Sequence, residues 1–360
     1  MNTKIRILYD GWPLVHQPAS HAALHLWELL HTLPNETEPV LALPAEAPAW
    51  FQPPAGLEVH STPLQNRAGD RLRWEQRLLP RLANHLGVNL AHLTHNHPAL
   101  LASVPTIISP GELPGGRGGP GLSRRLRAAL GRGGMARAQG MLWPSDLPRP
   151  AVRTPAELLP PLVHPDFSQP GPPPPIDLDL PETFILYHGS YRADELRNLF
   201  DAWVWGAGAL GDYYPMLLLG GRAAGLQLET VLERYDFGEA VISLPPAPPA
   251  DMAAIYRRAS ALIHPGPEVP WGGAIRHGLA SSLPIVTTDH PHNRAMVGAA
   301  AFTIPAGDTR KLGAGLITVI VEEAVSRKLA EAARRQASGW DQPAFRQMLM
   351  ASYRRFRNPA

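Results

Sequence analysis

Residues 251–302 read DMAAIYRRASALIHPGPEVPWGGAIRHGLASSLPIVTTDHPHNRAMVGAAAF, and this stretch decides the fold class. Three short apolar runs, at 261–263, 285–287 and 301–304, alternate with helical segments such as 274–281. Such alternation is typical of a parallel sheet covered by helices on its faces. The stretch therefore predicts part of a doubly wound α/β domain.

The same pattern extends in both directions along the chain. Strand-like runs precede the stretch at 184–187, 216–219 and 240–244, and others occur near the start at 5–9, 40–43, 90–93 and 106–108. Between the two groups, prolines at 170 and 172–175 exclude a helix or a central strand. We predict an N-terminal domain (1–168), a linker (169–180), a C-terminal domain (181–338) and a closing helical segment (339–360).

Composition limits the classes of function. The chain has 360 residues, 44% of them hydrophobic, which is enough for two cores. Its formal charge is only +2, so we expect no nucleic-acid partner. Cysteine is absent, which excludes disulfides and fits a reducing compartment. With no export signal and no apolar run of about 20 residues, a cytoplasmic location is expected.

Two loops of the C-terminal domain have the composition of a phosphate site. The first contains Gly189, Ser190 and Arg192 directly after a strand, and Arg197 follows in a helix. Glycine allows close approach of the backbone to an anion, and arginine can bind its oxygens in a bidentate manner. The alternative interpretation is a glycine turn with solvated arginines.

The second loop, 265–273, leads into a helix and ends with Trp271, Gly272 and Gly273. A pair of glycines before a helix is a plausible anion cradle, because unpaired amides gather there. His277 follows in the first turns of that helix and is a candidate ligand-binding residue. The alternative is a histidine with a purely structural role.

These residues together resemble the retaining GT4-type glycosyltransferases (glycosyl transferases group 1). The similarity is carried by 251–302, by 184–190 with 197–199, and by 340–353. It implies the GT-B architecture, two Rossmann-like domains that face each other across a cleft, and transfer of a sugar from a nucleotide diphosphate with retention. It also implies Glu268 and Arg197 as catalytic residues, the other loop residues named above as donor-binding residues, and neither a metal nor a cofactor.

The sequence departs from the family pattern at several places. The family has two glutamates separated by seven residues, and here His277 takes the second position and Val269 the first, with Glu268 one residue out of register. A further expected glutamate is Ala295. A second hypothesis therefore stays open, that of a catalytically impaired homologue that acts as a binding or scaffold protein.

The acceptor is not identified by the sequence, and a glycan, a lipid and a small molecule all remain candidates. The arginine-rich stretch between Arg124 and Arg137 predicts a basic helix, which is either a peripheral membrane contact or a solvated surface. His92, His95 and His97, and the pair His290 and His292, raise a metal hypothesis. Without clustered carboxylates in the sequence, we expect loop and surface histidines instead.

Overall fold

The structure is a computed structural model that describes residues 4–64, 67, 69–111, 122–149 and 151–357. The chain divides into two compact units. The first comprises Met1–Leu162, Val269–Gly272 and Asp341–Ala360, and the second comprises Val163–Glu268 and Gly273–Trp340. The proline-rich stretch 169–180 falls within the range of the second unit and forms no helix or strand.

The first unit contains a parallel sheet of seven strands among its described residues, in the order β3-β2-β1-β4-β5-β6-β7. The strands are β1 Ile5–Asp10, β2 Thr37–Leu43, β3 Glu58–Ser61, β4 Leu90–Leu93, β5 Thr106–Ile108, β6 Gly140–Pro144 and β7 Ala156–Leu159. The helices are α1 Trp12–His16, α2 His21–His31, α3 Asp70–Arg73, the π-helical turn Trp74–Leu78, α4 Leu79–His85, α5 Leu122–Met135 and α14 Gln342–Arg357.

The second unit contains a parallel sheet of six strands among its described residues, in the order β10-β9-β8-β11-β12-β13. The strands are β8 Ile185–Tyr187, β9 Met216–Leu218, β10 Val241–Ser243, β11 Ala261–His264, β12 Ile285–Thr288 and β13 Ala301–Ile304. The helices are α6 Ala193–Leu210, α7 Gly221–Ala224, α8 Leu226–Leu232, α9 Pro249–Arg258, α10 Ala274–Ala280, α11 Pro291–Val297, α12 Thr309–Val321 and α13 Glu323–Ala337, with 3-10 turns at Pro165–Phe167 and Gly238–Ala240.

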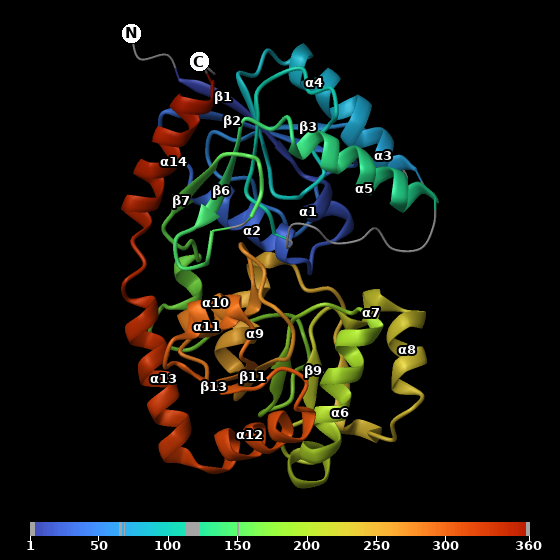
Figure 1. Ribbon diagram of the computed structural model, residues 1–360, viewed down its shortest axis with the longest axis vertical. Helices are drawn as coiled ribbons and strands as arrows, with labels where there is room; N and C mark the ends of the chain where they lie inside the picture. The colour runs from blue at the N-terminus through green and yellow to red at the C-terminus, as the bar shows by residue number, and fades with distance from the viewer. Residues whose placement is uncertain (1–3, 65–66, 68, 112–121, 150, 358–360) are drawn as a thin grey trace. The chain divides into compact units, whose positions relative to one another are not determined.

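Side-chain alternation on β11 explains why helices cover both faces of this second sheet. Ala261 and Ile263 belong to the core that α6 and α12 share, and these two helices pack side by side (Figure 1). Leu262 points to the other face, where it lies against Gly278 of α10. Both faces of the strand are therefore buried, as a doubly wound sheet requires.

The strand register brings the functional loops to one edge. Leu186 of β8 pairs with Leu262 of β11, and His264 at the end of β11 pairs with Thr287 of β12. Since all these strands are parallel, their carboxyl ends lie together. The loops that follow β8 and β11 are therefore neighbours within the second unit.

The predicted fold class, two doubly wound parallel-sheet domains, is confirmed. The predicted helices at the arginine-rich stretch and at the C-terminus are also confirmed, as α5 and α14. Strands β3, β6 and β7 of the first unit were not predicted, and β3 and β7 carry no clear apolar run. Most of the glycine- and proline-rich stretch 111–121 lies outside the described residues, and none of the described helices could span a bilayer.

Candidate functional site

The loop after β8 is held closed by its own side chains. The Tyr187 hydroxyl donates a hydrogen bond to the carbonyl oxygen of Ser190 at 2.6 Å, and the amide of Arg192 donates to the Ser190 hydroxyl at 3.2 Å. A Cβ at Gly189 would lie 2.8 Å from the Tyr187 ring, so only glycine fits without displacing that ring. Gly189 and Ser190 remain partly exposed at the end of the strand.

The two predicted arginines, Arg192 directly before α6 and Arg197 within it, are exposed and have partners in the first turn of α6. Arg192 forms an ion pair with Asp194, at 3.2 Å between guanidinium and carboxylate. The Nε of Arg197 donates to the carbonyl oxygen of Ala193 at 3.0 Å. The Arg192 guanidinium can exchange its partner for a ligand anion, since ion pairs at exposed sites are weak. The Arg197 contact is a single hydrogen bond to a backbone carbonyl at an exposed position.

Glu268, the predicted catalytic carboxylate, is fully buried at the end of the loop after β11. Its carboxylate accepts a hydrogen bond from the backbone amide of Ile275 in the first turn of α10. Its own amide donates to Asn293 at 2.8 Å, and the Nδ1 of His292 donates to its carbonyl oxygen at 3.2 Å. These contacts show that Glu268 caps the start of α10 and fixes the loop.

His277 is also fully buried. Its Nδ1 lies 2.7 Å from the carbonyl oxygen of Gly273, and because a carbonyl only accepts, this nitrogen carries the proton. The ring packs against Phe167 at 4.5 Å and Tyr256 at 5.9 Å between centroids. Tyr256 in turn hydrogen-bonds His188 after β8, at 2.8 Å, so the two loops are connected through buried side chains.

Trp271 and Gly272 belong to the first unit. The Trp271 indole N–H donates to the carbonyl oxygen of Leu142 at 2.9 Å, and its ring stacks on His25 at 5.0 Å. The Nδ1 of His21 donates to the carbonyl oxygen of Gly272 at 2.9 Å. Of the nine predicted site residues, seven lie in the second unit and two in the first.

Sequence reasoning missed Glu195 and His264. Glu195, in the first turn of α6, reaches Gly266 in the loop after β11. His264 is 4% exposed, at the end of β11. The sequence analysis gave neither residue a role, and the parallel register of β8 and β11 brings both of them to the same edge of the sheet.

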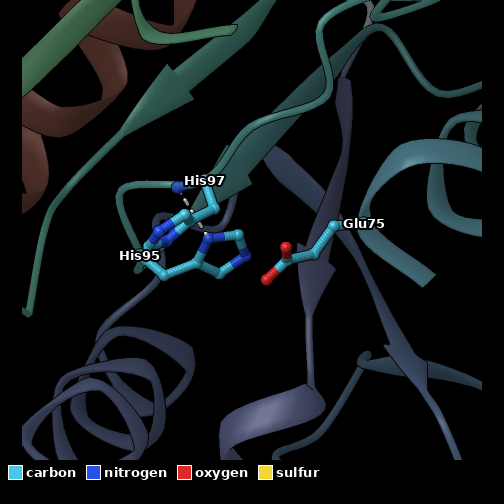
Figure 2. A group of neighbouring side chains, drawn as sticks. All are labelled: Glu75, His95 and His97. Carbon is cyan, nitrogen blue, oxygen red and sulfur yellow. Dashed lines mark hydrogen bonds between the residues drawn. The ribbon is translucent and has the colours of Figure 1, made fainter. Parts of the chain in front are cut away.

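In the first unit, Glu75, His95 and His97 place potential metal-ligand atoms near one another (Figure 2). The Nε2 of His95 donates to Asp10 at 2.7 Å, and its Nδ1 accepts from the amide of His97 at 3.1 Å, which uses both ring nitrogens. Glu75 accepts from Arg127, with contacts from 2.7 to 3.0 Å.

Arg71 adds a second ion pair to Glu75 at 3.1 Å. Burial and the charge of Arg127 lower the pKa of His97 to about 2. Two guanidinium groups beside the only carboxylate of the group oppose the binding of a cation. The contacts favour a buried ion-pair network over a metal centre.

The loops after β8 and β11 both lie within a stretch that matches a known protein family. Residues 183–322 match the model of the family described as Glycosyl transferases group 1. No curated protein gives a significant match. Many solved structures do match, and three of them illustrate the similarity.

WaaG, a glycosyltransferase involved in lipopolysaccharide biosynthesis, aligns with a TM-score of 0.71 and 12% identity over 97% of this chain and 99% of that chain. Sucrose-phosphate synthase from Thermosynechococcus elongatus aligns with a TM-score of 0.67 and 13% sequence identity over 98% of both chains. Anabaena Alr3699/HepE in complex with UDP-glucose aligns with a TM-score of 0.65 and 12% sequence identity, over 97% of this chain and 99% of that chain. The chain therefore has the GT-B fold, and its residues 183–322 carry a divergent glycosyl transferases group 1 sequence.

Proposed function

We propose that this protein is a retaining glycosyltransferase that transfers a sugar from a nucleotide diphosphate to a glycan, lipid or small-molecule acceptor. The observation that carries the proposal is the family match over 183–322, which includes the partly exposed Gly189–Ser190 loop and the start of α10 at Gly273. In parallel α/β sheets, ligands bind at this edge.

The nature of the donor is suggested by proteins with the same fold. The Anabaena structure holds UDP-glucose, and the trehalose-phosphate synthase from Burkholderia vietnamiensis is described as UDP-forming. We therefore propose UDP-glucose as the first donor to test. The acceptor side stays open.

We propose a metal-independent and cofactor-independent reaction. Arg197, Arg192 and the amides near Gly189 would neutralise the leaving diphosphate, and Glu268 would lie near the donor sugar. The donor phosphate would accept the proton of the acceptor hydroxyl, so no strong protein base is needed. This mechanism tolerates the loss of the second family glutamate at position 277.

One observation favours the second candidate function, a binding or scaffold protein. The carboxylate of Glu268 caps α10, and His277 is fully buried against Phe167 with its Nδ1 bound to Gly273. A ligand would have to exchange these internal contacts for its own. A homologue that has lost catalysis would keep them as packing.

Isothermal titration with UDP, GDP and ADP, followed by an assay of nucleotide release from the matching sugar donor, tests the proposal. We expect one nucleotide to bind, with a Kd at least tenfold weaker in Arg197→Ala. Arg294→Ala is the matched control, because Arg294 is an exposed arginine of α11 that pairs with Asp289. Binding without any turnover would favour the scaffold function, and no binding to any nucleotide would contradict the transferase.

The exposure of the side chains on α5 decides which arginines should be replaced in a test of membrane binding. On α5, Arg125, Leu126 and Arg132 are exposed, whereas Arg127 is committed to Glu75. We propose that the exposed face of α5 binds anionic lipid. Pelleting with vesicles that contain anionic lipid should fall for Arg125→Gln/Arg132→Gln and stay unchanged for Arg327→Gln on α13. Equal pelleting of all three proteins would remove the lipid proposal.

A further inference from the structure

The amino-terminal turn of α6 already carries negative charge of its own. Asp194 and Glu195 are the acidic residues of this turn, and the Asp194 carboxylate accepts hydrogen bonds from the first backbone amides of the helix. Unpaired amides and the helix dipole give a helix start its affinity for anions. In this chain, acidic side chains of the same helix already occupy some of these amides.

Glu195 extends from α6 to the loop after β11. A Cβ at Gly266 would lie 2.7 Å from the Oε2 of Glu195, so the carboxylate fills the space that a side chain at 266 would occupy. Ser190 hydrogen-bonds the Glu195 side chain, and the Nε of Arg192 lies 4.0 Å from its Oε1. A hydroxyl, a guanidinium and a bare glycine backbone are the surroundings in which proteins hold a phosphate oxygen.

His264 provides a second and independent observation at the same edge. It is 4% exposed, and neither of its ring nitrogens has a hydrogen-bond partner among the described residues. An electrostatic interaction links it to Glu195, so the two side chains are close enough to interact. Buried polar atoms without partners are costly, and sites that await a ligand are one place where they persist.

We propose that Glu195 is an internal anion, whose carboxylate occupies the position of a ligand phosphate at the ends of β8 and β11, so that a nucleotide diphosphate binds only in competition with it. The inference rests on the proposed function, because it concerns the same site. Two like charges cannot share one cradle, so the carboxylate must move aside or be neutralised when the diphosphate enters. Glu195 is thus a residue that sets the affinity and selectivity for the donor.

The electrostatic environment of Glu195 agrees with this role. Burial raises its pKa, and the nearby charges of His264 and Arg192 lower it without cancelling the effect of burial. An ionised carboxylate in this position is therefore poorly compensated. A side chain held in this way can leave the cradle at little cost.

The test compares Glu195→Gln with the wild type by isothermal titration at pH 8, with inorganic pyrophosphate and UDP as probes. Asp194→Asn is the matched control, because it removes one negative charge from the same helix turn at an exposed position. We expect pyrophosphate and UDP to bind at least tenfold more tightly to Glu195→Gln, with less than a threefold gain in Asp194→Asn. Unchanged or weaker binding in a Glu195→Gln protein that melts like the wild type overturns the proposal, and so does an equal gain in both variants.

The two probes separate this inference from the proposed function. A gain of pyrophosphate binding in Glu195→Gln, without UDP, GDP or ADP binding in any variant, supports the internal anion and contradicts the nucleotide-sugar donor. Equal UDP binding in the wild type and in Glu195→Gln overturns the internal anion and leaves the proposed function intact.

Discussion

The indole N–H of Trp271 donates a hydrogen bond to the carbonyl oxygen of Leu142 in β6, at 2.9 Å and across 129 positions of sequence. The Trp271 side chain is 1% exposed, stacks on His25 and meets Phe345 of α14 edge-on at 6.1 Å. A residue from the loop after β11 is therefore a core residue of the first unit. The sequence predicts a ligand contact for this residue, and the structure shows that its indole packs within the first unit.

Replacement of this indole should destabilise the first unit. Trp271→Phe keeps an aromatic ring but leaves the Leu142 carbonyl without its donor, and we expect a loss of about 1–3 kcal/mol in the free energy of unfolding. Trp271→Ala should cost about 3–5 kcal/mol. Urea unfolding measures both, with Trp205→Phe as the control, since Trp205 is 50% exposed. Equal small effects at both positions would contradict the anchoring role.

Gly272 should tolerate no side chain. Its φ is +69°, and a Cβ would lie 2.1 Å from the carbonyl oxygen of His21. Gly298 has a similar φ of +51° but nothing within 4 Å of its Cβ position. An alanine at 298 therefore measures the cost of the backbone conformation alone, without a steric clash. We expect Gly298→Ala to cost about 1 kcal/mol and Gly272→Ala to cost at least about 2 kcal/mol more. Thermal melting of the two variants decides, and similar melting points would refute the steric argument.

The Glu75 network should behave as a buried ion pair. The Glu75 side chain is 1% exposed, and Glu75→Ala leaves Arg127 and Arg71 without their carboxylate, so we expect a loss of about 3–5 kcal/mol. Glu323, which pairs with Arg327 on the surface of α13, is the control, and Glu323→Ala should change stability by less than about 0.5 kcal/mol.

The same network gives an expectation for metal ions. Addition of zinc should leave the melting temperature of the wild type unchanged, because Arg127 and Arg71 occupy the carboxylate and His95 has both ring nitrogens engaged. A saturable increase in melting temperature with zinc, lost in Glu75→Ala, would replace the ion-pair interpretation by a metal site.

Stability should fall in mild acid because of buried histidines. Burial lowers the pKa of His92 to about 3, and its ring nitrogens hydrogen-bond Ser109 at 2.7 Å and Tyr353 at 2.8 Å. A histidine with a lowered pKa in the folded state contributes its full stability above the unfolded pKa of about 6.5. This contribution is lost as pH falls from that value toward the folded pKa.

We therefore expect His92 to account for a slope of about 1.4 kcal/mol per pH unit between about pH 6 and 4. Denaturant unfolding of the wild type and His92→Gln over this range measures the slope. The variant starts from a lower stability but should show a flatter profile. Parallel profiles would assign the acid sensitivity to other groups.

Much of the second unit could be read from local sequence. Short apolar runs bounded by glycine and proline predicted β8, β11, β12 and β13, because a doubly wound sheet buries both faces of its strands. The loops at Gly189 and Gly273 were placed correctly at strand ends for the same reason. In the first unit, β3, β6 and β7 were not predicted, and Glu157 interrupts the four-residue run of β7.

The sequence by itself determined the fold class, the strands of the second unit and the loops that end them, because periodicity and turn residues act over a few neighbours. Only the tertiary structure decided what the individual side chains do. Trp271 packs in the core of the first unit, Glu268 caps α10, and Glu195 fills the space beside Gly266. These roles depend on residues far along the chain, such as Leu142, which lies 129 positions from Trp271, and no local pattern encodes which of them a side chain meets.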